Sequence, residues 1–178
     1  MSLTLNLNQG QVAERKTFIT VAEWTEGSST AQREILGTRT EDSSMEFNPD
    51  METMTDVRGI TYTDVNKTEP EQTFDPFYVM GGSLLASYLT AAALENRIAD
   101  YNNVFTIYQI AAFSGSSQNG YYTVKHAHCT ILPTSIGGDA KVSMPIEIHF
   151  SNDITIGTVN KLADDFEFTA SSTSGTNL

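Results

Sequence analysis

Several residue types are scarce in this chain, and each scarcity excludes a class of protein. Cysteine occurs once, as Cys129, so a disulfide within the chain is excluded. Only 10 lysine and arginine residues stand against 22 aspartate and glutamate residues, which gives a formal net charge of -12 at pH 7. No basic cluster is present, so tight binding to nucleic-acid phosphates is not expected. The charge suits either simple solubility or a surface that must not bind nucleic acid.

Long apolar runs are also missing. No stretch approaches the roughly 18 residues that a membrane helix requires, so we expect no membrane association. The first eight residues, Met-Ser-Leu-Thr-Leu-Asn-Leu-Asn, contain neither a basic region nor a long apolar stretch, and they do not resemble a secretory signal. At 178 residues the chain is most simply one domain with a sizeable core.

One stretch has the apolar spacing of a helix. A predicted helix over residues 83–95 follows two glycines, and Ser83 is placed to accept hydrogen bonds from its first free N–H groups. Its apolar stripe predicts a core-facing side. The candidate core residues of this helix are Leu84, Leu85, Tyr88 and Leu89. A single amphipathic helix needs a sheet to pack against.

Most of the remaining chain alternates apolar and polar residues, as strands do. Strands are predicted over 16–24, 51–58, 60–66, 104–113, 121–132 and 141–150, with a turn at Asn48-Pro49-Asp50, a hairpin turn at Asn119-Gly120 and a polar linker over 68–75. The sequence therefore predicts a mainly β fold, a β-sandwich or barrel with one flanking helix. We expect an N-terminal arm over residues 1–15, a β domain over 16–169 and a flexible tail over 170–178. The arm is either an edge strand or a segment that orders on a partner.

The one cluster that suggests metal chemistry contains Gly120, His126 and His128. Histidines two positions apart on a strand share a face and can share a metal, and the spacing resembles the first half of the cupin motif. The glutamate expected next is replaced by Leu132 and Pro133, and His149 lacks the expected spacing as a third ligand. We therefore assign no metal and no cofactor. A strand with alternate histidines, and with Cys129 packed on the opposite face, explains the pattern.

Other catalytic patterns are not present. The sequence has no Gly-x-Ser-x-Gly nucleophile motif, and the glycine pair before the helix lacks the lysine and the spacing of a phosphate loop. No catalytic residue is assigned. Two other classes stay open: a metal-dependent, cupin-like β-barrel enzyme, and a carbohydrate-binding sandwich using surface aromatics such as Trp24 and Tyr121.

The order of several segments resembles the major tail tube proteins of long-tailed, siphovirus-type bacteriophages. The segments are 45–59 (MEFNPDMETMTDVRG), 61–70 (TYTDVNKTEP), Phe74-Asp-Pro, Gly81-Gly with the following helix, 133–139 (PTSIGGD), and 144–150 (MPIEIHF) with Ile156-Gly157. The resemblance covers residues 16–169. It lies in the order and general character of these segments, since no single motif in it is diagnostic.

This resemblance implies a structural protein without enzyme activity. Six copies would form a ring, the rings would stack into a tube, and DNA would pass through the acidic lumen without tight binding. The protein would be made in the host bacterial cytoplasm and reside in the virion tail beside other tail proteins. The candidate lumen charges are Glu46, Glu52, Asp56 and Asp64. The alternatives with the same fold are a ring or tube protein of a contractile injection system and a tail-terminator or baseplate ring subunit.

Overall fold

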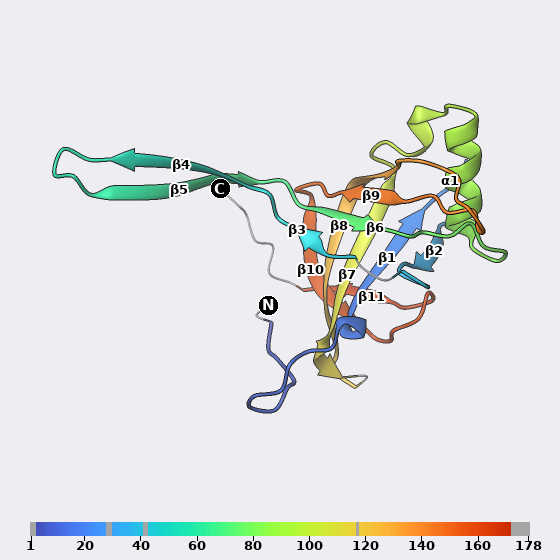
Figure 1. Ribbon diagram of the computed structural model, residues 1–178. Coiled ribbons are helices and arrows are strands. Elements are labelled where there is room, and N and C mark those ends of the chain that lie inside the picture. Colours follow the sequence, from blue (N-terminus) through green and yellow to red (C-terminus); the bar gives the residue numbers. More distant parts are fainter. Residues whose placement is uncertain (1–2, 28–29, 41–42, 117, 172–178) are drawn as a thin grey trace.

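The fold is a curled antiparallel sheet with one helix and one long hairpin that leaves the body (Figure 1). The computed structural model describes residues 3–27, 30–40, 43–116 and 118–171. The described strands are β1 (Phe18–Trp24), β2 (Gln32–Ile35), β3 (Met45–Glu46), β4 (Pro49–Thr55), β5 (Thr61–Thr68), β6 (Glu71–Phe74), β7 (Phe105–Ser116), β8 (Gly120–Pro133), β9 (Ile146–His149), β10 (Ile154–Val159) and β11 (Phe168–Ala170). The helices are α1 (Leu84–Leu94) and two 3-10 turns, η1 (Arg15–Thr17) and η2 (Ile98–Asp100).

Nine of these strands form one sheet in the order β2-β1-β7-β8-β9-β6-β3, with β10 and β11 branching from β8. The branch arises because β8 is long: its first half pairs with β10 and its second half with β9. The sheet therefore divides and curls into two layers. The predicted mainly β fold with one flanking helix is confirmed.

Strands β1 and β7 lie inside the sheet and are buried on both faces. Trp24 and Phe105 belong to the main core, together with side chains of β6, β8, β9 and α1. Tyr108 and Phe166 belong to a second cluster on the other face, under β10 and the segment before β11. Trp24 is only 2% exposed, so its proposed role as a surface aromatic for glycan binding is wrong.

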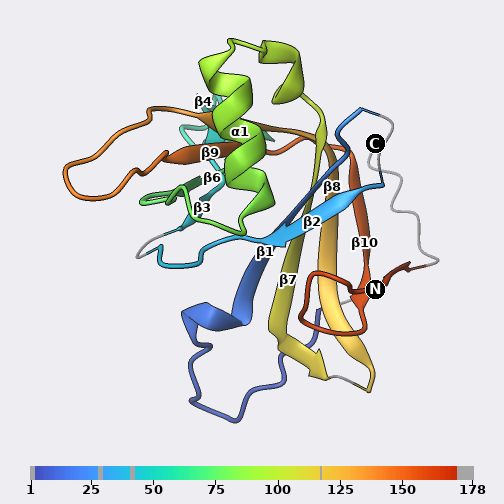
Figure 2. The same cartoon turned by 90° about the vertical axis from the view of Figure 1, so that its right-hand side faces the viewer.

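Helix α1 packs over one side of the main core (Figure 2). The Ser83 hydroxyl accepts a hydrogen bond from the Ala86 amide at 3.1 Å, as expected of an N-cap. A second cap comes from β2, where the Glu34 carboxylate accepts hydrogen bonds from the Ser83 hydroxyl and the Leu85 amide at 2.6 and 3.0 Å. A carboxylate at this position also interacts favourably with the helix dipole.

The predicted apolar stripe of the helix is correct except at its first residue. Leu85 and Leu89 are fully buried, and Tyr88 is half-buried against the core, where its hydroxyl donates a 2.8 Å hydrogen bond to the Asp100 carbonyl. Leu84 was expected in the core but is 53% exposed. The buried stripe is completed by Ala86 and Ala92, and Leu84 lies outside it.

A small polar network lies buried between the two layers. The Thr20 hydroxyl of β1 lies 3.0 Å from the Gln72 Oε1 of β6 and 3.1 Å from the Gln109 Oε1 of β7. Gln109 donates to Gln72 at 2.8 Å, and Gln72 donates to the Ser43 carbonyl at 3.0 Å. These bonds satisfy groups that would otherwise destabilise the core, and they fix β6 against β1 and β7.

Two sequence-based assignments around the hairpin are wrong. The predicted turn at Asn48-Pro49-Asp50 is not a turn between strands, because Pro49 is the first residue of β4. The predicted linker over 68–75 contains β6, whose Gln72 and Phe74 are buried between β3 and β9. Proline is tolerated at the start of a strand, so Pro49 and Pro70 mark strand beginnings here.

The ends of the chain are described only in part. Residues 3–14 contain no helix or strand, so the arm is not an edge strand, and its Asn6 amide donates to the Phe113 carbonyl at 2.9 Å. The predicted flexible tail lies outside the described residues from 172 onward. Within the described part of the chain, none of the helices has the length and apolar character needed to cross a membrane.

Candidate functional site: a two-faced hairpin

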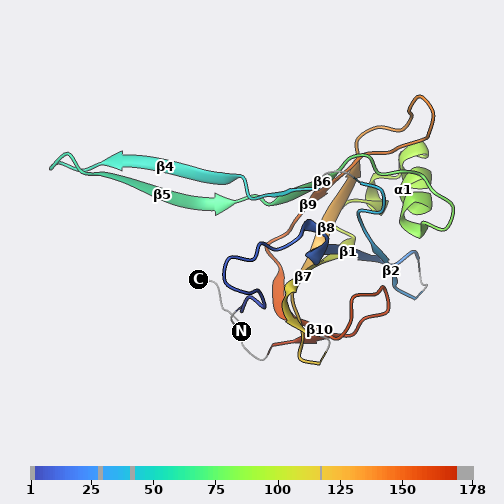
Figure 3. The same cartoon turned by 60° about the horizontal axis from the view of Figure 1, so that its bottom comes forward.

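The most exposed ordered feature of the chain is the hairpin of β4 and β5. It forms its own two-stranded sheet, and it extends away from the body on the side opposite α1 (Figures 1 and 3). Every residue of both strands is exposed. At the base of the hairpin, the Glu69 amide donates to the Phe47 carbonyl at 3.1 Å, and this hydrogen bond joins the segments that lead into and out of the hairpin.

The tip of the hairpin is built around Asp56. Its Oδ1 accepts hydrogen bonds from the Arg58 amide at 2.8 Å and the Ile60 amide at 3.0 Å. These donors, the Ile60 amide first, lower the pKa of the Asp56 carboxyl below its usual value. Gly59 takes a φ of 79°, which glycine adopts without strain. The hairpin therefore turns at 56–60, where side-chain capping and a left-handed glycine coincide.

The strand register gives the hairpin two different faces. Glu52 is paired with Asp64, and Met54 is paired with Tyr62, so these four side chains share one face. Asp56 belongs with them, because the Tyr62 hydroxyl lies 3.5 Å from its Oδ2. We call this the acidic face. The opposite face, here called the uncharged face, consists of Met51, Thr53, Thr55, Thr61, Thr63 and Val65.

The acidic face is only partly compensated within the hairpin, where the Arg58 Nε lies 3.4 Å from the Asp56 Oδ2. Glu52 and Asp64 lie directly opposite each other, and like charges in that position destabilise a strand pair. A two-stranded hairpin is already only marginally stable in water. The hairpin nevertheless exposes apolar side chains that are each at least 44% accessible, namely Phe47, Met51, Met54, Val57, Ile60, Tyr62 and Val65. Such a surface is typical of a contact with another protein chain.

The structure brings three of the four predicted lumen residues together. Glu52, Asp56 and Asp64 share the acidic face, as the alternation of 51–58 and 60–66 indicated. Glu46 lies apart from them in β3, at the edge of the body sheet, where it is paired with Glu71 of β6. The charges thus occupy two neighbouring surfaces, one on the hairpin and one at its root.

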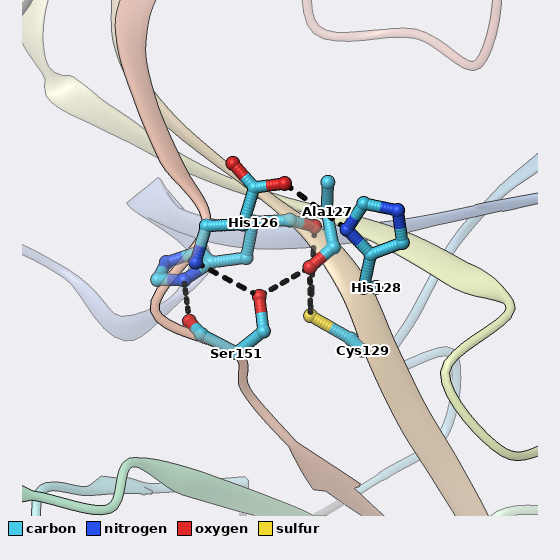
Figure 4. Close-up of polar contacts among 6 residues, drawn as sticks. His126, Ala127, His128, Cys129 and Ser151 are labelled. Carbon is cyan, nitrogen blue, oxygen red and sulfur yellow. Dashed lines mark hydrogen bonds and ion pairs between the residues drawn. The ribbon is translucent and has the colours of Figure 1, made fainter.

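The histidine pair does not have the geometry that metal sharing requires. Between the pairs Phe105–Cys129 and Ile107–His126, β8 has one residue more than β7, and His128 takes a positive φ of 56°. This bulge interrupts the alternation, so the His126 and His128 rings point in different directions (Figure 4). The expectation that they share a face is therefore wrong.

The environments of the two rings differ accordingly. His126 is 5% exposed, its ring packs edge-on against Phe150, and burial lowers its pKa. The exposed His128 Nδ1 lies 3.0 Å from the Asp153 carboxylate. Cys129 is buried in the main core, where desolvation raises the pKa of its thiol, as expected for an unreactive packed cysteine.

His149 lies elsewhere, on β9, with carboxylates of Glu71 and Glu147 at 3.8 and 3.7 Å. Within the described ranges of the chain, no group of three or more histidine, cysteine, aspartate or glutamate side chains is arranged to hold a metal ion. The cupin-like alternative therefore has no support from the positions of its own candidate ligands.

Sequence reasoning located the charges of the hairpin but missed its projection. The strands over 51–58 and 60–66 were predicted as part of one β domain over 16–169, without a projection from it. The sequence did contain one indication of this projection. Both runs are less apolar than 104–113, and threonine occupies four of the alternate positions on one face. Strands without a continuous apolar face have nothing to bury against a core.

Comparison with known proteins gives a fold and no family. No protein-family model matches the chain, and no curated protein matches it. A solved structure with a similar fold is a chain of the "Cryo-EM structure of the anti-feeding prophage (AFP) baseplate, 6-fold symmetrised". The match has 11% identity and a TM-score of 0.50, and it covers 88% of this chain and 100% of that chain. At this identity, the likeness establishes a shared fold.

Proposed function

We propose that this protein is a structural subunit of a phage-tail-like particle, where copies of it assemble into stacked, hexameric rings that form a tail tube. The observation that carries the proposal is the fully exposed β4–β5 hairpin, with an acidic face and an uncharged face. The fold shared with a chain of a 6-fold symmetrised prophage baseplate supports it. In this proposal the protein acts by assembly and not as an enzyme.

The energetics of the hairpin favour such a role. Its exposed apolar side chains gain about 25 cal/mol for each Å² that a partner removes from water. Neither face can pack against its own body, because the hairpin extends away from it (Figure 3). A second copy of the chain supplies the missing surface, and repeated contacts of this kind build an assembly.

The acidic face has a complementary role in a tube. Glu52, Asp56 and Asp64 repel the phosphates of DNA when they line the channel, so that DNA slides without binding. Glu46, at the root of the hairpin, extends the same negative surface onto the body. The proposed partners are therefore other copies of this chain and other tail proteins, with DNA passing through. The proposed location is the tail of the particle.

A second candidate is a ring subunit of a baseplate, which forms single rings and no tube. The similar structure favours it, because that chain comes from a prophage baseplate. Both candidates use the same ring, and they differ in whether one ring stacks on the next.

Negative-stain electron microscopy of the purified protein tests the proposal and separates the two candidates. Tubes of indefinite length support the tail tube, and single rings support the baseplate subunit. A variant in which residues 49–68 are replaced by a short glycine-rich turn should remain folded and should form neither. A protein that stays monomeric at high concentration, or a hairpin-deleted variant that assembles normally, would contradict the proposal.

A further inference from the structure

A groove of about 610 Å³ lies on the body beside α1. Its walls are the first turns of the helix and the segment before it. The lining residues are Val79, Met80, Gly81, Gly82, Ser83, Leu84, Ser87, Thr90 and Ala91. None of them carries a charge, and Leu84 is 53% exposed although it is an aliphatic residue at the start of a helix.

This groove and the uncharged face of the hairpin have the same chemistry. Both consist mainly of apolar side chains and small hydroxyl residues, with two glycines in the groove, and neither contains an ionisable group. Shared neutrality matters in a chain with a net charge of -12, because two copies repel each other wherever their acidic surfaces meet. Contacts between copies are therefore most favourable where both surfaces are uncharged.

We propose that the uncharged face of the hairpin of one copy docks into the groove beside α1 of a second copy, an inference that rests on the proposed function. The hairpin and α1 lie on opposite sides of the body (Figure 1), so one chain cannot make this contact with itself. A hairpin strand of seven residues extends roughly 24 Å at about 3.4 Å per residue, which lets it reach beyond its own body.

The contact joins two different surfaces, so it is head-to-tail. Each copy offers one hairpin and one groove, and every bound copy leaves a further hairpin and a further groove free. Contacts of this kind close into a ring or continue as a filament, whereas a symmetric contact between identical surfaces ends at a dimer. With its uncharged face covered, the hairpin leaves its acidic face, with Glu52 and Asp64, directed away from the groove.

Site-directed cross-linking tests this contact. Two variants that each add one cysteine, Thr53→Cys on the uncharged face and Ser87→Cys in the groove, are mixed under assembly conditions and treated with a short bismaleimide. Both positions are exposed, so neither substitution disturbs the core. Cys129 is fully buried, and wild-type protein treated in the same way checks that it does not react.

The matched control is Glu52→Cys. Glu52 is next to Thr53 in the strand, but its side chain is on the acidic face, opposite to that of Thr53. Peptide mass spectrometry should find the 53–87 link at a yield at least tenfold above the 52–87 link. Equal yields, or no 53–87 link in protein that forms rings or tubes, overturn the docking site and leave the proposed function standing. Protein that forms no assembly in the microscope overturns both.

Discussion

Removal of the hairpin should leave the body as stable as before. The perturbation replaces residues 49–68, so that Asn48 and Glu69 are joined by a short turn where the Glu69 amide already meets the Phe47 and Asn48 carbonyls at 3.1 and 3.4 Å. No residue of β4 or β5 belongs to either core cluster. The buried apolar area lost with the hairpin is therefore close to nothing.

The remaining contributions to the free energy of unfolding are small. Shortening the connection about fivefold favours folding by about 1.4 kcal/mol, at ~0.6 kcal/mol for each halving of loop length. A new turn that strains the base hydrogen bonds costs about 1 kcal/mol. These contributions oppose each other, so we expect a net change within about 1 kcal/mol. A Leu89→Ala substitution in the buried face of α1 provides the comparison, since it should cost about 2–5 kcal/mol.

Urea denaturation followed by tryptophan fluorescence measures both variants, because the buried Trp24 reports on the main core. The hairpin-deleted variant should unfold at nearly the wild-type midpoint and with nearly the wild-type slope. A loss of more than about 3 kcal/mol for the deletion would instead show that the hairpin is part of the folding unit.

Three further predictions follow from single side chains. Ser83→Ala should destabilise the protein by about 0.5–2 kcal/mol in the same urea experiment, since it removes the helix N-cap and the hydroxyl that Glu34 binds; an unchanged midpoint would argue against that cap. Burial lowers the folded-state pKa of His126, so the native state holds its proton less tightly than the unfolded chain, and stability should fall as the pH drops below about 6.5. In thermal unfolding, His126→Gln should reduce this loss of stability between pH 7 and pH 5. The control is His128→Gln, which replaces the exposed ring. Equal pH dependence of the two variants would contradict the assignment of the effect to His126. Asp64→Thr removes the charge opposite Glu52 and should stabilise the hairpin by a few tenths to about 1 kcal/mol. Amide hydrogen exchange should then be slower in β4 and β5 and unchanged in the body. Faster exchange would contradict a destabilising repulsion between Glu52 and Asp64.

The helix and the central strands were predictable because their signals are local. Ser83 follows two glycines and precedes an apolar stripe, and both the cap and the buried residues Leu85 and Leu89 lie where the pattern indicated. The alternation over 104–113 likewise indicated a strand, and β7 lies there, between β1 and β8. The prediction that Leu84 is buried was wrong because an apolar residue in the first helical turn can lie beside the buried stripe and not within it.

The features that the sequence did not predict depend on strand pairings between residues far apart in the chain. The extra residue opposite β7 turns His128 away from His126, and only the register with the partner strand reveals such a bulge. β6 was read as a linker because its four residues gain their burial from β3 and β9, which lie far away in sequence. The projecting hairpin was missed for a related reason, since alternation places side chains on faces and does not say what those faces meet.

Electron cryo-microscopy of the assembled protein would locate the hairpin within the particle. We expect rings or stacked rings in which the β4–β5 hairpin is buried between copies, with Glu52, Asp56 and Asp64 facing the central channel. A map in which the hairpin lies free on the outside of the particle, or in which these three carboxylates face away from the channel, would contradict it.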